Sequence, residues 1–274
     1  MLTDGTIGVF DSGYGGLTIL EHFQALLPRY DYIYLGDNAR TPYGNRSFDV
    51  VYEFTRESVE RLFEMGCNLV ILACNTASAK ALRTIQQRDL PGWGADKRVL
   101  GIIRPTAEAI GTLTRNGHVG LLATEGTIQS ESYPLEIRKI YPELQVSGQA
   151  CPMWVPLVEN GEAESPGTDF FVKQYLDRLL QQDPDIDTVV LACTHYPLLA
   201  HKIRKYLPKH IQILAQGPLI ASSLQNYLQR HPDLDRHLTQ GGTTRFYTTE
   251  NVDRFTQSAS IFLKKTIKTE HITL

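Results

Sequence analysis

Two cysteines occupy matching positions in this chain. Cys74 follows the apolar run 69–73, and Cys193 follows the similar run Thr188–Ala192. The polar side chains directly after the two thiols are Asn75, Thr76, Thr194 and His195. An unperturbed thiol titrates at about pH 8.5, and a helix N-terminus lowers that value. Because a turn into a helix follows each cysteine, we expect thiols that act as acid or base near neutral pH.

Two thiols on opposite sides of one cleft favour inversion at a carbon centre. A racemase removes a proton from one face of a carbon and returns one to the other face, which needs an opposed base and acid. The α-proton of an amino acid is weakly acidic, so preorganised donors must stabilise the carbanionic charge. The candidate donors are Ser12, Asn75, Thr76 and Thr194. Asp11 and His195 are candidates to adjust the two thiols, one from each half of the chain.

Two further polar clusters follow apolar runs nearer the N-terminus. Residues 11–16 (Asp-Ser-Gly-Tyr-Gly-Gly) permit close backbone approach, and the helix after them presents free N–H groups to an anion. This pattern fits a site for a substrate carboxylate and fits equally a helix N-cap in a Gly-rich turn. Residues 36–44, with Asp37 and Tyr43, are dense in hydrogen-bonding groups. In isolation they are also typical of a surface loop.

Short β-rich runs alternate with segments of helical period along the chain. We expect strands at residues 7–10, 32–35, 69–73, 99–103, 119–123, 188–192, 211–214 and 244–248. We expect helices at residues 17–27, 48–65, 78–87, 170–181, 197–206, 219–228 and 253–263. Such alternation predicts an α/β fold class, with mainly parallel sheets and helices on their faces.

The two halves of the chain resemble each other. The run that ends at Cys74 matches the run that ends at Cys193, and residues 7–13 match residues 119–125 more weakly. A lone cysteine at such a position is usually a small buried hydrophobe. Because the position is duplicated, a paired chemical role is favoured here.

This repeat predicts two pseudosymmetric α/β domains. We expect a first domain over residues 1–97 plus about 211–274, and a second over residues 98–210. Residues 88–97 contain a proline and two glycines and are the best linker candidate.

Bulk properties indicate a globular protein in water. Of the 274 residues, 42% are hydrophobic and 21% are charged, and the formal net charge of −3 favours neither a nucleic acid nor a membrane as partner. The first residues lack an export signal and no apolar run could span a bilayer, so we expect a cytoplasmic location. The four cysteines and eight histidines lack the spacings of a disulfide framework or a metal site.

Taken together, these motifs resemble those of the glutamate racemases in the aspartate/glutamate racemase superfamily. The resemblance runs over most of the chain and is specific because the motifs occur as an ordered set. It is carried by Asp11-Ser12-Gly13-x-Gly15-Gly16, Gly36-Asp37-x-x-x-x-Pro42-Tyr43-Gly44, Cys74-Asn75-Thr76-Ala77, Ala123-Thr124-Glu125-Gly126-Thr127, Val155-Pro156-Leu157-Val158-Glu159 and Cys193-Thr194-His195-Tyr196-Pro197.

The resemblance implies an active site in the cleft between the two domains. It implies interconversion of L- and D-glutamate without pyridoxal phosphate, any other cofactor or a metal. Cys74 would deprotonate the D form and Cys193 the L form. Asp11, Glu159 and His195 are assisting candidates, and Asp37 is a further supporting acid. The substrate contacts that carry over are Asp11, Ser12, Tyr43, Gly44, Asn75, Thr76, Thr194 and His195.

The resemblance also implies a cytoplasmic bacterial enzyme, as a homodimer, whose product D-glutamate supplies peptidoglycan synthesis. Two segments depart from the family pattern. Residues 103–106 replace a common Pro-Gly, and residues 215–218 (Ala-Gln-Gly-Pro) replace a segment that usually carries Asp-Ser or Asp-Gly. We expect these departures to affect domain packing and oligomer geometry rather than substrate contacts.

Several alternatives stay open on the residues alone. Aspartate or another amino acid is a possible substrate, because pocket depth cannot be read from a sequence. A decarboxylase or isomerase on the same scaffold typically retains one cysteine or lacks the amino-acid contacts. A cysteine-dependent hydrolase could use the neighbouring Cys193 and His195, although Cys74 would then have no role. A non-catalytic ligand-binding protein would not require paired thiols.

Overall fold

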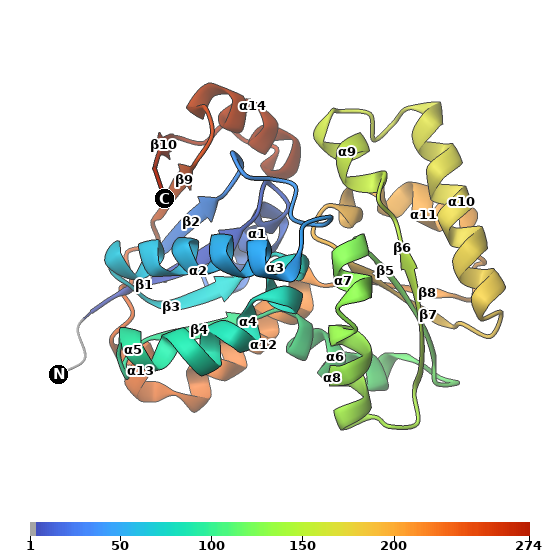
Figure 1. Cartoon of the computed structure of the whole chain (residues 1–274), viewed down its shortest axis with the longest axis horizontal. Helices are drawn as coiled ribbons and strands as arrows, with labels where there is room; N and C mark the ends of the chain where they lie inside the picture. Colours follow the sequence, from blue (N-terminus) through green and yellow to red (C-terminus); the bar gives the residue numbers. More distant parts are fainter. Residues whose placement is uncertain (1–3) are drawn as a thin grey trace.

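The computed structural model describes residues 4–274, and its framework is two separate parallel β-sheets (Figure 1). The first sheet contains, in spatial order, β10 (Thr269–His271), β9 (Thr244–Thr248), β2 (Tyr32–Gly36), β1 (Thr6–Asp11), β3 (Cys67–Leu72) and β4 (Arg98–Gly101). The second contains β6 (Gln145–Ala150), β5 (His118–Ala123), β7 (Thr188–Ala192) and β8 (Gln212–Ala215). All neighbouring strands run parallel. The predicted α/β class with mainly parallel sheets is confirmed.

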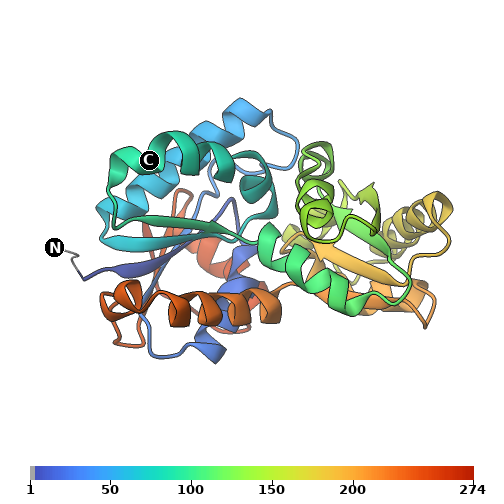
Figure 2. The ribbon, with the colours of Figure 1, turned by 90° about the horizontal axis from the view of Figure 1, so that it is seen from below.

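Helices surround both sheets, and Figure 2 shows helices above and below the first one. Those beside the first sheet are α1 (Gly16–Leu26), α2 (Phe48–Glu64), α3 (Asn75–Lys80), α4 (Leu82–Thr84), α5 (Leu90–Trp93), α12 (Gly217–Arg230), α13 (Pro232–Arg236) and α14 (Val252–Leu263). Those beside the second are α6 (Ile103–Leu113), α7 (Glu125–Gln129), α8 (Ser132–Ile140), α9 (Trp154–Glu159), α10 (Pro166–Gln182) and α11 (Ala200–Tyr206). Within residues 4–274, no helix is both long and apolar enough to cross a membrane.

The apolar runs become strands because both faces of each sheet are covered. β2, β3 and β7 are buried along their whole length, as expected for central parallel strands. The edge strand β6 is only half-buried or exposed, and its sequence Gln-Val-Ser-Gly-Gln-Ala is largely polar. An edge strand needs no continuous apolar run, which explains why the sequence pattern did not predict it.

Side-chain caps fix where two long helices begin. Ser47 Oγ accepts a hydrogen bond from Val50 N at 3.4 Å at the start of α2. Ser165 Oγ accepts one from Thr168 N at 3.4 Å at the start of α10. These hydroxyls satisfy N–H groups that have no partner within the helix.

The linker predicted at residues 88–97 is wrong, because this segment leads into β4, which belongs to the first sheet. The chain continues from α4 through a π-helical segment, Ile85–Asp89, into α5, and turns only at Gly94, whose φ is +126°. Pro91 is the second residue of α5 and so lies within this continuous helical stretch. The strand expected at residues 99–103 is likewise shorter, because α6 begins at Ile103.

Two strands belong to a different sheet from the one that the predicted domain boundaries assign to them. Residues 98–101 were expected in the second domain, but β4 pairs with β3 in the first sheet. Residues 212–215 were expected in the first domain, but β8 pairs with β7 in the second sheet. Both are edge strands next to the points where the chain passes between the sheets. A short apolar run at such a point does not specify which sheet it extends.

The packing of α10 on the second sheet gives a stability prediction. Leu179 is fully buried, and its side chain occupies the space above Gly120 of β5. Leu179→Ala should therefore lower the free energy of unfolding by about 2–5 kcal/mol, measured by urea denaturation followed by circular dichroism. Leu135→Ala, at a leucine with 48% of its surface exposed, should change it by less than about 0.5 kcal/mol. Equal effects of the two substitutions would contradict the packing described.

Candidate active site

A cavity of about 370 Å³ lies between the carboxyl ends of the strands of the two sheets. Asp11 pairs with Gly36 at the ends of β1 and β2, and Cys74 lies just beyond the end of β3. In the second sheet Ala123 pairs with Ala192, so the residues that follow β5 and β7 also lie close together. Parallel strands bring their carboxyl ends to one edge of a sheet, where ligands of α/β proteins bind.

The structure brings the predicted catalytic and substrate-binding residues to this one cavity. From the first sheet and its loops, the lining includes Asp11, Ser12, Tyr43, Gly44, Cys74, Asn75 and Thr76. From the second, it includes Glu159, Cys193, Thr194 and His195. Their individual roles remain predictions.

Asp37 lies behind the cavity rather than on its surface. It is fully buried and accepts hydrogen bonds from the Tyr43 hydroxyl and from Arg40 Nε, the latter at 2.6 Å. Burial, followed by the negative charge of Asp37, raises the pKa of Tyr43. Asp37 therefore holds the Tyr43 ring in place as a neutral phenol.

Some lining residues are missing from the sequence-based prediction. Thr124 and Cys151 both line the cavity, at the ends of β5 and β6. Thr124 stands at the position that matches Ser12 in the internal repeat, so the repeat could have identified it. Cys151 follows the polar edge strand, which gave no comparable signal.

Cys74 caps the first turn of α3. Its Sγ accepts a hydrogen bond from Ala77 N at 3.4 Å and lies 3.3 Å from Ser12 Oγ. Burial, followed by the charge of Asp11, raises the pKa of the Cys74 thiol to about 12, although both hydrogen bonds act in the opposite direction. The expectation that this thiol acts as acid or base near neutral pH through a lowered pKa is therefore wrong, because removal from water outweighs the lowering effect of the hydrogen bond at the helix N-terminus.

Cys193 has different neighbours from Cys74. Its Sγ lies 3.8 Å from His195 Nδ1, and His195 Nε2 lies 2.9 Å from Glu159 Oε1. Burial opposes the charged imidazolium, but the interactions with Cys193 and Glu159 raise the pKa of His195 overall. A protonated His195 donates toward both neighbours, and so provides a positive charge beside the second thiol.

Asp11 lies near the reactive groups of both halves. Its Oδ2 accepts a hydrogen bond from Gly13 N at 2.9 Å, whereas its buried Oδ1 has no hydrogen-bond partner among the described residues. Burial raises the pKa of Asp11, and the nearby His195 partly offsets this. A buried acceptor without a partner at the edge of a cavity suits a cationic donor such as an ammonium group.

The Gly-rich loop packs against the second half of the site. A Cβ on Gly15 would lie 2.1 Å from Thr194 Oγ1 and 2.5 Å from His195 Nδ1, so only glycine fits there. Thr18 Oγ1 also lies 3.2 Å from the Thr194 carbonyl oxygen. The glycine thus permits close contact between the two units. This contact is a third explanation for the Gly-rich loop, beside the anion site and the helix N-cap that the sequence suggests.

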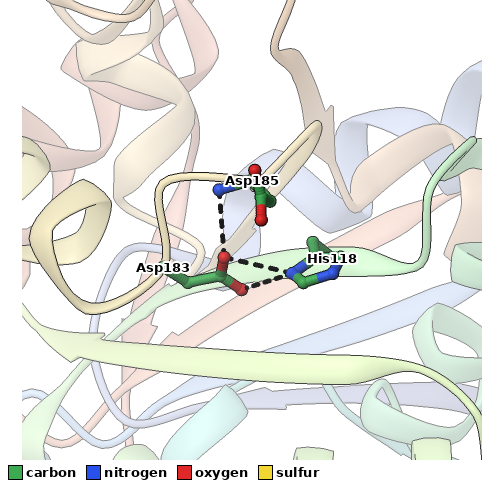
Figure 3. A group of neighbouring side chains, drawn as sticks. All are labelled: His118, Asp183 and Asp185. Carbon is green, nitrogen blue, oxygen red and sulfur yellow. Dashed lines mark hydrogen bonds and ion pairs between the residues drawn. The ribbon is translucent and has the colours of Figure 1, made fainter.

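A second cluster of titratable groups lies at the opposite end of β5 (Figure 3). His118 Nδ1 lies 2.9 Å and 3.1 Å from the two carboxylate oxygens of Asp183, and Asp185 N donates to Asp183 at 3.0 Å. The hydrogen bond with Asp183 raises the pKa of His118. Each oxygen of Asp183 already accepts a hydrogen bond. These contacts join the start of β5 to the end of α10, which is a structural role for the cluster.

Comparison with known proteins identifies the family of this chain. A family model described as Asp/Glu/Hydantoin racemase matches residues 17–222. A glutamate racemase of Ruegeria sp. (strain TM1040) is 39% identical over 275 residues, covering 96% of this chain and 98% of that protein. The chain therefore belongs to the Asp/Glu/Hydantoin racemase family.

Two solved structures extend this similarity to the fold. Glutamate racemase isoform RacE1 from Bacillus anthracis superposes with a TM-score of 0.89 at 34% identity, covering 98% of each chain. Glutamate racemase from Francisella tularensis, solved in complex with D-glutamate, superposes with a TM-score of 0.87 at 30% identity, again covering 98% of each chain. The two-sheet arrangement is thus shared with known glutamate racemases over almost the whole chain.

The environment of Cys74 predicts how its reactivity depends on pH. Only the thiolate reacts with iodoacetamide, so the alkylation rate of Cys74 should rise about tenfold per pH unit between about pH 8 and 10, without a plateau. At a fixed pH, Asp11→Asn should accelerate alkylation by removing a charge that raises the pKa, and Ser12→Ala should slow it by removing a hydrogen bond that lowers the pKa. Mass spectrometry of the peptide that contains Cys74 measures both rates. A plateau below about pH 9, or the same direction of change in both variants, would contradict this assignment.

Proposed function

We propose that this protein is a glutamate racemase that transfers the α-proton between Cys74 and Cys193 without a cofactor. The observation that carries the proposal is that two free thiols, each beyond a central strand of a different sheet, line one cavity. The names of the relatives support glutamate as the substrate. The cavity volume also suits a small amino acid rather than a polymer.

The reaction needs one thiolate and one thiol at a time. For L-glutamate, the Cys193 thiolate takes the α-proton, which breaks the C–H bond and forms an S–H bond. The Cys74 thiol then donates its proton to the opposite face of the carbanionic carbon. The raised pKa of Cys74 keeps this thiol protonated in the free protein, as its acid role requires. D-glutamate reacts with the two roles exchanged.

The groups around the thiols suit the charges of an amino acid. Asp11 offers its unpartnered oxygen to the substrate ammonium. Hydroxyl, amide and backbone N–H donors of both halves are available to the two carboxylates and to the carbanionic charge. Among these, Ser12, Asn75, Thr76 and Thr194 are the proposed side chains. Such donors are effective because they are already oriented before the proton moves.

His195 and Glu159 are proposed to assist Cys193. A protonated His195 stabilises the thiolate of Cys193 and is itself held by Glu159 at 2.9 Å. Asp11 and Ser12 occupy the corresponding place beside Cys74. The two thiols are thus related by the repeat, but their helpers are chemically different.

A cysteine hydrolase is the second candidate, favoured by one specific observation. Cys193, His195 and Glu159 form a chain of nucleophile, base and orienting acid. This candidate leaves Cys74 and its hydrogen bond to Ser12 without a role. Aspartate racemase activity is tested by comparing the turnover of L-aspartate with that of L-glutamate.

We further propose the biological setting that the family resemblance implies. The protein would act in the cytoplasm as a homodimer, and its D-glutamate would supply peptidoglycan synthesis.

The first prediction concerns proton exchange at the substrate. In D₂O, purified protein without added cofactor should convert L-glutamate to D-glutamate that carries deuterium at the α-carbon, because Cys74 exchanges its proton with solvent before donating it. Chiral chromatography with mass spectrometry measures both isomers. Neither inversion nor deuterium incorporation, with protein that retains its circular dichroism spectrum, would exclude the proposed reaction.

The second prediction separates the two thiols. Cys74→Ser and Cys193→Ser should each lower racemisation by at least about a hundredfold, since one acid–base group is lost in each. A β-chloro amino acid needs only one deprotonation before chloride leaves. Each variant should therefore retain elimination from one enantiomer only, L for Cys74→Ser and D for Cys193→Ser. Elimination of the same enantiomer by both variants would refute opposed thiols, whereas retained racemisation in either would refute the two-base reaction.

A further inference from the structure

A buried ring of hydrogen bonds joins Asn75 of the cavity to the connection between β8 and α12. Asn75 Nδ2 donates to Gln216 Oε1 at 2.8 Å, and Gln216 Nε2 donates to the Tyr133 hydroxyl at 2.6 Å. The Tyr133 hydroxyl donates in turn to Asn75 Oδ1 at 2.6 Å, which closes the ring. All three residues are at least 98% buried.

Thr106 fixes the direction of the hydrogen bonds in this ring. Its hydroxyl donates to the Ile102 carbonyl oxygen at 2.7 Å and therefore accepts from Gln216 Nε2, also at 2.7 Å. Both protons of Gln216 Nε2 are then used, one for Thr106 and one for Tyr133. The single proton of Tyr133 must go to Asn75 Oδ1. The amide of Asn75 consequently has one defined orientation.

This orientation matters because Asn75 also lines the cavity. Its oxygen is engaged by Tyr133, and one of its two Nδ2 protons is engaged by Gln216. The other proton is left to donate to a ligand. A flipped amide would place a carbonyl oxygen there instead, which repels a carboxylate.

The ring also links the two sheets to each other. Asn75 begins α3 beside the first sheet, whereas Thr106 and Tyr133 belong to α6 and α8 beside the second. Gln216 lies at the start of α12, where the chain passes back to the first sheet. The same four side chains therefore set both the orientation of Asn75 and its position relative to the second half of the cavity.

We propose that Gln216 is a positioning residue that orients Asn75 to bind a carboxylate of the substrate. This inference rests on the proposed racemase function. Gln216 lies in the segment 215–218, which the resemblance marks as a departure from the usual Asp-Ser or Asp-Gly. From the sequence we expected this departure to affect domain packing and oligomer geometry rather than substrate contacts, whereas the proposed role connects it to the substrate through Asn75.

The test compares the kinetics of matched variants. Gln216→Met keeps the length of the side chain but removes its hydrogen bonds. Tyr133→Phe removes the hydroxyl that donates to Asn75 Oδ1 and accepts from Gln216 Nε2. Ser132→Ala is the control, because Ser132 Oγ donates to the Ala79 carbonyl oxygen at 3.0 Å and so also joins α8 to α3, without contact to Asn75. KM and kcat are measured for both enantiomers, and the dissociation constant of glutamate by calorimetry.

Gln216→Met should raise KM and the dissociation constant about tenfold, the usual effect of one buried hydrogen bond, while kcat changes less than about threefold. Tyr133→Phe should act in the same direction, and Ser132→Ala should leave KM unchanged. In an Asn75→Ala background, Gln216→Met should have less than about a twofold further effect on KM, because its target is already absent.

The results that would overturn this inference differ from those that would overturn the proposed function. A Gln216→Met protein with lowered thermal stability but unchanged KM would show that Gln216 is only structural, as would full additivity with Asn75→Ala. If Gln216→Met does not fold, an unchanged KM in Tyr133→Phe would refute the inference equally. A wild-type protein that does not act on glutamate would instead refute the proposed function.

Discussion

The site depends on one geometric constraint, which is that two parallel sheets point their carboxyl ends into the same cavity. A parallel sheet places all its strand ends at one edge, so a short loop after each strand brings its first residues into a common space. Asp11, Cys74 and Cys193 are all carried in this way. Gly15 allows the two edges to approach closely, because any side chain at this position would collide with Thr194 and His195.

Burial of this shared space then determines the chemistry of its groups. Removal from water raises the pKa of Cys74 and of Asp11, and favours their neutral forms. His195 is equally buried but keeps a raised pKa, because Cys193 and Glu159 supply specific partners for its charge. Thus the same loss of solvent leaves the neutral form favoured at Cys74 and the charged form favoured at His195, according to whether an oppositely charged partner is within hydrogen-bonding distance.

Much of this arrangement could be predicted from the sequence, and the limits have physical causes. Central strands such as β3 and β7 are continuous apolar runs, so both cysteines could be placed at strand ends. The edge strands could not be placed as well, because β6 is polar and β4 and β8 are short runs that either sheet could accept. The raised pKa of Cys74 depends on how deeply it is buried, which no local pattern records.

The ring around Gln216 shows the same limit at longer range. Asn75 and Gln216 are 141 residues apart in the sequence, and no periodicity relates them. The family resemblance marks the segment as a departure, but only the three-dimensional contacts connect it to the cavity. Departures from a family pattern are therefore informative when the structure shows what the new side chain touches.

The central claim is that two thiols approach one carbon from opposite sides, and a crystal structure with bound glutamate tests it most directly. The account predicts Cys74 Sγ and Cys193 Sγ each at about 3–4 Å from the α-carbon, on opposite faces, with the substrate ammonium near Asp11. A complex with both sulfurs on the same face, or with glutamate bound away from either sulfur, would contradict the account.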